Sequence, residues 1–238
     1  MRIAAFSDVH GNLHALKAVL ADVDEQKVDR VFCLGDLVGY GAYPNEVIEL
    51  IRARGIPTIM GNYDQGVGID RDECGSAYTD PEMRRLGDLS LQWSKERVTP
   101  ENKAFLRSLL PNIRLEVEGR RVLLVHGSPR KINEYLYEDR GQSSLERVAK
   151  MSNADVLVFG HTHLPYVKEV AGVLFVNTGS AGKPKDGDRR VAYALVDLGR
   201  EVTATIRRVP YDVAAAAAAV RASGLPQRFA ELLESASG

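Results

Sequence analysis

The chain has 238 residues, of which 45% are hydrophobic and 26% are charged, and its formal net charge is −1. These values are typical of a globular protein and fit one large domain or a domain with a small cap. The balanced charge predicts no attraction to a membrane surface and argues against nucleic acid as a partner. Cys33 and Cys74 form no metal-binding or redox motif. We therefore expect no disulfide framework and a cytoplasmic location.

The first sixty residues alternate predicted strands and helices. Short apolar runs predict strands at 2–7, 30–34 and 57–60. Apolar residues at helical spacing predict a helix at 12–26, and a second helix begins at Pro44 and ends at Gly55. This alternation is typical of a layered α/β domain in which helices pack on a sheet.

Residues from about 64 to 111 interrupt the alternation. Gly66, Gly68 and Gly75 predict a loop, and two amphipathic helices follow. Their apolar faces contain Met83, Leu86, Leu89 and Trp93 in the first, and Phe105, Leu106 and Leu109 in the second. We predict a single domain, 1–238, with this segment inserted as a small helical cap beside the functional site. The alternative is a helical packing layer that does not contact substrate.

The second half of the chain is rich in predicted strands. A hairpin is expected at 113–125, with its turn at Glu118-Gly119-Arg120. Further strands are expected at 155–159, 173–177, 191–197 and 202–208. Asp212 is a candidate N-cap for an alanine-rich helix that ends at Gly224, and a last helix holds Phe229, Leu232 and Leu233.

Metal-ligating residue types gather directly after the predicted strands. Four of the five histidines lie in such motifs, and two further motifs supply oxygen ligands; together they contain Asp8, His10, Asp36, Asn62, His126, His161 and His163. Imidazole and carboxylate are ligands of choice for divalent transition metals. Loops at the carboxyl ends of strands in an α/β sheet converge on one edge. The pattern therefore predicts a two-metal hydrolytic centre.

Local spacing supports this prediction. Asp8 and His10 are two residues apart, as are His161 and His163, so on extended backbone each pair would point the same way. The alternative, that each histidine is a polar core residue bonded to backbone, is reasonable for one histidine but not for four at strand ends. His14 lies one helical turn after His10, and we expect it on the surface or behind the ligands.

Candidate substrate contacts are less well defined. The segment Gly179-Ser180-Ala181-Gly182-Lys183-Pro184 lacks the spacing of a nucleotide-triphosphate loop. A phosphate contact from Ser180, Lys183 or Lys185 stays open. Arg130 is a better candidate because a guanidinium matches phosphate oxygens, although it could also be a solvated loop charge. We predict substrate contacts from Asn12, Tyr63, Arg130 and Ser180.

Five motifs together resemble the calcineurin-like metallophosphoesterase superfamily. Asp8-Val9-His10 is similar to its D-x-H motif, Gly35-Asp36 to G-D, Gly61-Asn62 to the start of G-N-H-[DE], His126 to the isolated histidine, and Gly160-His161-Thr162-His163 to G-H-x-H. Asn177-Thr178-Gly179-Ser180 also resembles the small bacterial phosphodiesterase branch. The resemblance implies two packed, mixed β-sheets flanked by helices.

The resemblance also implies a ligand set. The first metal would be held by Asp8, His10, Asp36 and His163, and the second by Asp36, Asn62, His126 and His161. Manganese is the metal implied, with iron, zinc or nickel as alternatives. The family's full motif has a histidine at position 63, where this chain has tyrosine. This departure argues against efficient phosphomonoesterase or protein phosphatase activity.

We expect a metal-dependent phosphodiesterase that acts on small, nucleotide-like phosphodiesters. A hydroxide that bridges two metals would attack phosphorus in line, with Asp36, Asn62 and Arg130 as the catalytic residues. One alternative is a pyrophosphohydrolase of dinucleoside polyphosphates. Another is a metal-binding scaffold, as in the retromer subunit that resembles this superfamily. We expect no membrane or nucleic-acid partner, and assembly as a homo-oligomer is left open.

Overall fold

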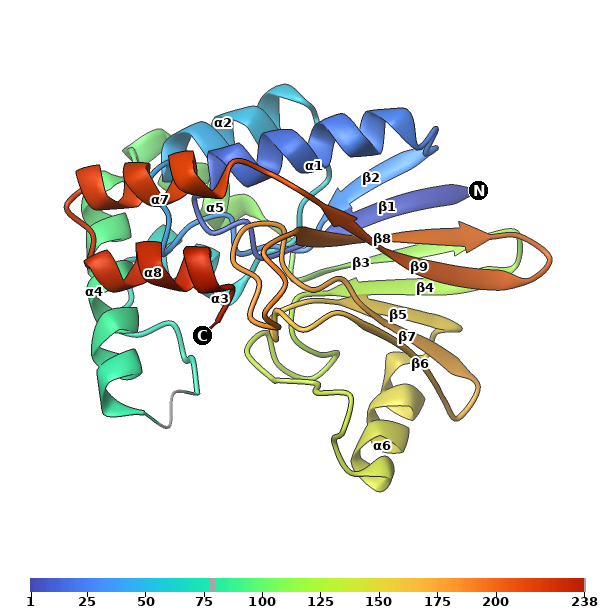
Figure 1. The fold of residues 1–238 in the computed structure, drawn as a ribbon. Helices are drawn as coiled ribbons and strands as arrows, with labels where there is room; N and C mark the ends of the chain where they lie inside the picture. Colours follow the sequence, from blue (N-terminus) through green and yellow to red (C-terminus); the bar gives the residue numbers. More distant parts are fainter. Residues whose placement is uncertain (78–79, 238) are drawn as a thin grey trace.

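Two β-sheets pack face to face in the computed structural model, which describes residues 1–77 and 80–237 (Figure 1). The first sheet has the spatial order β2 (Arg30–Cys33), β1 (Arg2–Phe6), β8 (Val191–Leu198), β9 (Val202–Val209). The second has the order β3 (Asn112–Val117), β4 (Arg120–Val125), β5 (Val156–Phe159), β7 (Val173–Asn177), β6 (Tyr166–Val170). Each sheet contains parallel and antiparallel pairs, which confirms the predicted mixed sheets.

Alternation along the strands divides the core into layers. In β1, Ile3 and Ala5 join the apolar cluster between the two sheets, whereas Ala4 and Phe6 join the cluster under the helices. The same division holds in β4, where Leu124 faces the first sheet and Leu123 faces away from it. Because successive strand residues point to opposite faces, both sheets are covered on both sides. The result is a four-layer arrangement of helices, sheet, sheet and helix.

Most helices share one apolar cluster with the outer face of the first sheet. They are α1 (Leu13–Glu25), α2 (Pro44–Ala53), α3 (Asn62–Gly68), α4 (Pro81–Arg97), α5 (Pro100–Ser108), α7 (Val213–Ala222) and α8 (Gln227–Ser235). Of these, α1 packs on β8 and β9, whereas α4 and α8 lie beyond the ends of the strands (Figure 1). The opposite face of the second sheet is covered by α6 (Gln142–Ser152), which buries Leu145 and Val148 against that sheet. Asp212 caps α7 as predicted, because its side chain accepts a hydrogen bond from the amide of Ala215.

The segment at 64–111 contains most of α3, then a loop that includes Gly75, and then the two predicted helices. Gly66 and Gly68, which predict a loop, lie in α3 instead, where their lack of a side chain permits close packing: a Cβ on Gly68 would lie 3.2 Å from Leu106 of α5. Trp93 of α4 and Leu106 belong to the same apolar cluster as α1 and α2. These are the contacts of a packing layer, and a cap function for this segment stays a prediction.

Other boundaries also differ from the sequence-based expectation. The run at 57–60 forms only two isolated bridges, at Thr58 and Ile59, because it passes Cys33 and Leu110 without a continuous partner strand. The helix α6 and the edge strand β6 were not predicted. Within the described residues, 1–77 and 80–237, every helix is too short or too polar to cross a membrane.

The fold brings the ends of four strands to one place. The strands β1 and β2 are parallel, as are β4 and β5. The loops that follow β1 and β2 run side by side, with the amides of Asp8 and His10 bonded to the carbonyls of Gly35 and Asp36. Between the second pair, the amide of Gly160 donates to the carbonyl of His126. These loops hold the predicted metal ligands.

Candidate metal centre

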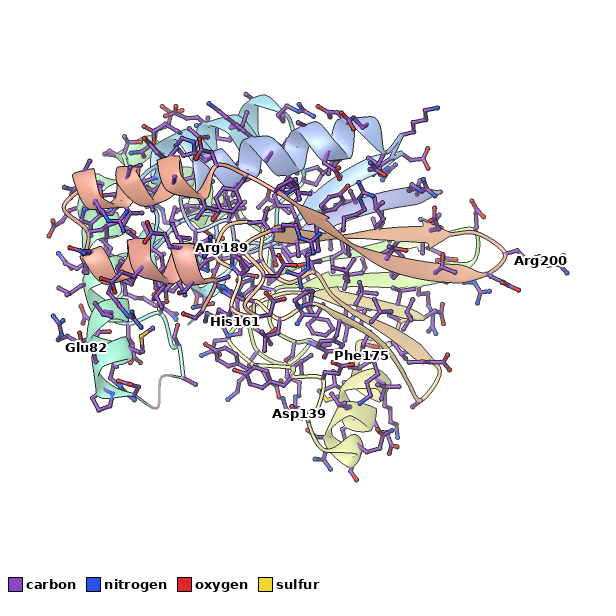
Figure 2. The ribbon with its side chains drawn as sticks, viewed as in Figure 1. Glu82, Asp139, His161, Phe175, Arg189 and Arg200 are labelled. Atoms are coloured by element: carbon purple, nitrogen blue, oxygen red, sulfur yellow. The ribbon has the colours of Figure 1, made fainter. Side chains whose placement is uncertain are left out.

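The seven predicted ligands lie at one edge of the two-sheet sandwich. Asp8 and His10 follow β1, Asp36 follows β2, Asn62 begins α3, His126 follows β4, and His161 and His163 follow β5. Figure 2 shows His161 among the loops between the sheets and the helical region. All seven residues are buried, although each carries a polar or ionisable side chain. Such burial requires partners for their polar atoms.

Tight turns, and not extended backbone, present most of these ligands. Left-handed φ angles occur at Asp8 (57°), His10 (49°), Asp36 (55°), His161 (66°) and His163 (62°). The extended geometry expected for the two ligand pairs is therefore wrong, because β1 and β5 end before them. Non-glycine residues in this region are strained by about 1–3 kcal/mol each and are concentrated at functional sites. The turns need support from their surroundings.

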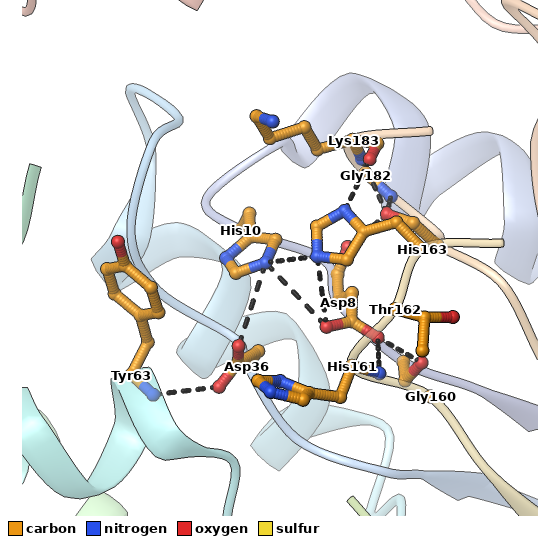
Figure 3. A network of polar contacts seen from close by, with 12 residues as sticks. Asp8, His10, Asp36, Tyr63, Gly160, His161, Thr162, His163, Gly182 and Lys183 are labelled. Carbon is orange, nitrogen blue, oxygen red and sulfur yellow. Dashed lines mark hydrogen bonds and ion pairs between the residues drawn. The ribbon is translucent and has the colours of Figure 1, made fainter. Parts of the chain in front are cut away.

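Asp36 lies between two groups of imidazoles. Its Oδ2 atom is 3.7 Å from Nε2 of His10 and 3.5 Å from Nε2 of His126. On the His10 side, Nε2 of His163 lies 3.2 Å from Nε2 of His10 and 3.3 Å from Oδ1 of Asp8 (Figure 3). The carboxylate of Asp36 therefore faces both halves of the site.

The His126 side completes the cluster. Nε2 of His126 is 3.1 Å from Nδ1 of His161 and 3.1 Å from the amide oxygen of Asn62. The amide nitrogen of Asn62 donates to the carbonyl of Cys74, which directs the oxygen toward the imidazoles. The ligand atoms form two sets, and within each set all atoms lie within 4.8 Å of one another. One set comes from Asp8, Asp36, His126 and His161, and the other from Asp8, His10 and His163.

Backbone carbonyls orient three of the imidazoles. Nδ1 of His10 lies 2.9 Å from the carbonyl oxygen of Val38. Nδ1 of His126 lies 2.8 Å from that of Leu34, and Nδ1 of His163 lies 2.5 Å from that of Lys183. A carbonyl can only accept, so Nδ1 carries the proton and donates. In a neutral ring, Nε2 then presents a lone pair to the cluster. This tautomer is the one that metal ligation through Nε2 requires.

Each carboxylate of the cluster has one oxygen held by the protein and one directed inward. Oδ2 of Asp8 accepts from the hydroxyl of Ser7 at 2.5 Å and from the amide of His161 at 2.9 Å. Oδ1 of Asp36 accepts from the amide of Tyr63 at 2.8 Å. This leaves Oδ1 of Asp8 and Oδ2 of Asp36 facing the imidazoles. The two aspartates are thus presented as ligands in fixed orientations.

Unpartnered buried atoms show that the residues fit a metal. Among the described residues, Oδ1 of Asp8 and Nε2 of His161 are buried without a hydrogen-bond partner. A buried acceptor without a partner costs about 1–3 kcal/mol, and a charged one costs more. Both atoms belong to residues of the ligand sets, and the set mixes carboxylate, imidazole and amide donors. This donor chemistry suits divalent transition metals.

Electrostatics in the site favour a bound cation. Burial lowers the pKa of His161 and of His163 to about 3, so both rings are neutral near pH 7. Burial acts to raise the pKa of Asp8 and Asp36, but the nearby imidazoles outweigh it and hold both values below the usual range. Burial also acts to lower the pKa of His126, but the charge of Asp36 raises it to about 9. The two buried carboxylates therefore attract positive charge, which the metal-free cluster takes up as a proton on His126.

Asp64 is a structural residue that the sequence analysis did not single out. Its carboxylate accepts from the amides of Asp36, Leu37 and Gly61 at 2.8–2.9 Å, which joins the Asp36 turn to the start of α3. Burial, followed by the charge of Asp36, raises the pKa of Asp64 to about 7. Its place two residues after Asn62 in the Gly-Asn-Tyr-Asp motif was the available signal.

Three predicted substrate contacts, Asn12, Ser180 and Tyr63, make hydrogen bonds within the protein, and their contact with substrate stays a prediction. Asn12 caps α1 through its side-chain oxygen and donates to the carbonyl of Gly182. Ser180 donates to the carbonyl of Asp8 and accepts from the amides of Gly182 and Lys183. The hydroxyl of Tyr63 donates to that of Tyr40 at 2.6 Å, on the far side of the His10 ring from Asp8 (Figure 3). These side chains are buried, and their hydrogen bonds are made within the protein.

Arg130 forms an ion pair with Glu134. Its Nε atom donates to Glu134 at 2.9 Å, and Nη2 contacts the other oxygen of the same carboxylate. It lines a cavity of about 140 Å³ together with His126 and Ser128. This ion pair differs from the predicted contact with phosphate. The catalytic role proposed for Arg130 stays a prediction.

His14 lies outside the cluster. It is half-buried on α1, its ring packs against Tyr43 with a centroid distance of 5.8 Å, and it lines a small cavity that His10 also borders. This agrees with the expected position behind the ligands.

Tyr135 packs on the metal-ligand candidate His161 with a ring-centroid distance of 4.0 Å. No motif marked Tyr135, because its partner is distant in the sequence.

A buried carboxylate and imidazole cluster at the edge of a two-sheet sandwich defines a metal-dependent hydrolase. The family model of the calcineurin-like phosphoesterase superfamily domain matches residues 1–201. The chain therefore belongs to the calcineurin-like phosphoesterase superfamily and is a metal-dependent phosphoester hydrolase. This confirms the superfamily and the enzyme class predicted from the motifs.

Individual proteins extend this similarity over nearly the whole chain. An uncharacterized protein of Methanocaldococcus jannaschii is 34% identical, with 97% of this chain and 96% of the relative covered. The crystal structure of a metallophosphoesterase from Sphaerobacter thermophilus is 31% identical, with a TM-score of 0.78 and coverage of 99% of this chain and 100% of that chain. Phosphodiesterase YfcE of Escherichia coli is 23% identical, with coverage of 83% and 88%.

Proposed function

We propose that this phosphoester hydrolase is a phosphodiesterase with a two-metal centre. One ion is assigned to Asp8, His10, Asp36 and His163, and the other to Asp36, Asn62, His126 and His161. The observation that most supports this assignment is the position of Asp36, whose Oδ2 atom faces His10 on one side and His126 on the other. The unpartnered Oδ1 of Asp8 and Nε2 of His161 add two inward-facing ligand atoms.

The residues of the chain prepare the site for chemistry. Divalent ions bound here supply Lewis acidity, which makes water nucleophilic near neutral pH and offsets negative charge on phosphoryl oxygens. The protein holds one oxygen of each aspartate by hydrogen bonds and leaves the other to the cluster. Carbonyl acceptors lock the rings of His10, His126 and His163. Ligands held in this way need little rearrangement during the reaction.

A diester with a good leaving group is the proposed substrate. The residue at 63 is a buried tyrosine whose hydroxyl is bonded to Tyr40, so it does not supply a proton to the leaving group. An unperturbed phenol is in any case a poorer match than an imidazole for general-acid catalysis at neutral pH. The similarity to Phosphodiesterase YfcE supports the same reaction class. We propose small nucleotide-like diesters as substrates and manganese as an activating metal.

The test is hydrolysis after controlled metal loading. The chain is treated with chelator, reloaded with manganese, iron, zinc or nickel, and assayed on bis(p-nitrophenyl) phosphate and p-nitrophenyl phosphate. Metal content per chain is measured by elemental analysis. We expect two metals per chain at saturation, no activity after chelation, and faster hydrolysis of the diester. One metal per chain at full activity would overturn the two-metal assignment, and preference for the monoester would overturn the phosphodiesterase proposal.

A further inference from the structure

A cleft of about 530 Å³ borders the metal centre. Tyr135, Tyr137, Lys183, Lys185 and Arg228 are among its lining residues. Tyr135 packs on His161, and the carbonyl of Lys183 accepts from His163, so the walls of the cleft contact both halves of the ligand cluster. Figure 3 shows the side chain of Lys183 beside His163 and extending past His10. A molecule in this cleft would lie next to the cluster.

Within the described residues, two lysines that line this cleft form no ion pair, although the charge of Asp8 favours the charged form of both. Lys183 is only 3% exposed, and its ammonium lies 5.0 Å from the centre of the Tyr40 ring. Lys185 is half-buried. Over residues 1–77 and 80–237, neither ammonium makes an ion pair or a hydrogen bond to the protein, and the charge of Lys185 acts unfavourably on Lys183. Burying an ammonium group without an ion pair is costly.

The other charged groups in the cleft have partners. Arg228 contacts Glu231 at 2.9 Å. The carboxylate of Asp80 accepts from the amides of Glu82 and Met83 as the N-cap of α4. Lys183 and Lys185 are thus the cations lining the cleft that have neither a hydrogen bond nor an ion pair within the described residues. Because they lie beside a cluster of metal ligands, an anion bound at the cluster would be attracted toward them.

We propose that Lys183 and Lys185 bind a second phosphate group of the substrate, adjacent to the phosphate that is cleaved. This inference rests on the proposed function and narrows its substrate class to phosphate compounds that carry at least two phosphates, such as esters of nucleoside diphosphates. An internal phosphate of such a compound has two non-bridging oxygens and can accept from two ammonium groups at once. Simple diesters without a second anionic group would lose these contacts.

The test compares two substrates that differ by one phosphate. They are the p-nitrophenyl ester of thymidine 5′-monophosphate and the p-nitrophenyl ester on the terminal phosphate of thymidine 5′-diphosphate. The manganese-loaded native chain should have at least a tenfold higher kcat/KM on the diphosphate ester. Lys185→Met should reduce this ratio tenfold or more, and Lys185→Arg should retain most of it. Lys150→Met on the exposed face of α6 is the charge-matched control, and its ratio should equal that of the native chain.

Two further measurements separate binding from structural damage. Calorimetry with methylenediphosphonate, which is not hydrolysed, should show at least tenfold weaker binding to manganese-loaded Lys185→Met than to the native chain. Lys183→Met should melt at or above the native temperature, because it removes a buried charge and retains the shape of the side chain. A lower melting temperature for Lys183→Met would mean that this ammonium stabilises the fold, which would contradict the proposal.

The outcomes distinguish this inference from the proposed function. If the native chain cleaves the monophosphate ester and the Lys185 variants keep the native ratio, the second-phosphate site is wrong while the phosphodiesterase proposal stands. If the metal-loaded native chain cleaves neither ester, nor bis(p-nitrophenyl) phosphate, the proposed function itself is wrong. A native preference that depends on Lys185 supports both.

Discussion

The hydroxyl of Tyr63 donates a hydrogen bond of 2.6 Å to the hydroxyl of Tyr40. Both rings also pack edge-on against the imidazole of His10, at centroid distances of 5.4 and 4.8 Å. The residue at the position of the family's histidine is thus part of the wall that holds a metal ligand. We infer that Tyr63 positions His10 and does not transfer a proton to substrate.

Tyr63→Phe should therefore have little effect on the chemical step. The ring remains against His10, and only the hydrogen bond to Tyr40 is lost, at a cost of about 1 kcal/mol in the free energy of unfolding. We expect kcat/KM on bis(p-nitrophenyl) phosphate to stay within about threefold of the native value, since the hydroxyl is remote from the reaction. A loss of a hundredfold with unchanged metal content would instead identify Tyr63 as a catalytic acid.

Asp36→Asn should remove the ligand that faces both halves of the site. The substitution keeps the shape but removes the charge, so we expect kcat/KM to fall by at least about a hundredfold at limiting manganese. Manganese at a hundredfold excess over its Kd should stabilise the native chain by about 2.7 kcal/mol, and the variant by much less. Asp88→Asn, on the exposed face of α4, is the control. The bridging assignment fails if Asp36→Asn retains the native response to manganese.

Gly160→Ala should displace Asp8 without removing any ligand. A Cβ at this position would lie 2.0 Å from the hydroxyl oxygen of Ser7 and 2.6 Å from Oδ2 of Asp8. We expect a loss of about 1–3 kcal/mol in the free energy of unfolding and a fall of at least tenfold in kcat/KM, because a crowded core must shift. Gly141→Ala is the matched control, since no atom lies within 4 Å of its added Cβ. Equal effects of the two substitutions would contradict this account.

Asp22 should make stability depend on pH. It accepts hydrogen bonds from Tyr193 at 2.6 Å and Arg207 at 2.8 Å, which join α1 to β8 and β9. Burial acts to raise the pKa of Asp22, but these hydrogen bonds lower it below its ordinary value of 3.8. Because the pKa of Asp22 is lower in the folded state than in the unfolded state, its ionised carboxylate stabilises the fold at pH values above the unfolded-state pKa. This stabilisation is lost as the pH falls through the folded-state pKa.

The corresponding variant is Asp22→Asn, measured by urea unfolding between pH 7 and pH 3. We expect it to be less stable than the native chain by about 1–2 kcal/mol at pH 7, and the difference to shrink as the pH falls below about 4. Asp24→Asn breaks an exposed ion pair with Arg54 and should cost less at every pH. A difference for Asp22→Asn that is constant across this range would show that charge is not its cause.

The sequence by itself determined the ligand types and their places after the strands. Asp8, His10, Asp36 and His126 could be recognised because a short apolar run precedes each motif and because the ends of parallel strands meet. The same apolar runs predicted the strands of both sheets, except where the presence of a partner strand decided whether a strand formed. The segment at 57–60 has strand-like residues, but only isolated bridges form, since it meets β2 only at Cys33, where that strand ends.

Tertiary structure alone decided what the remaining polar side chains do. Ser180 bonds to the carbonyl of Asp8, 172 positions away in the chain, and Asn12 bonds to the carbonyl of Gly182, 170 positions away. The residue type shows that such a side chain can bind a phosphate. Only the folded chain shows whether the side chain already makes its hydrogen bonds to backbone groups. Lys183 and Lys185 illustrate the reverse case, because their lack of an ion pair depends on the elements that pack around them. Local patterns reveal ligands near strand ends, whereas the partners of a buried polar group are set by long-range packing.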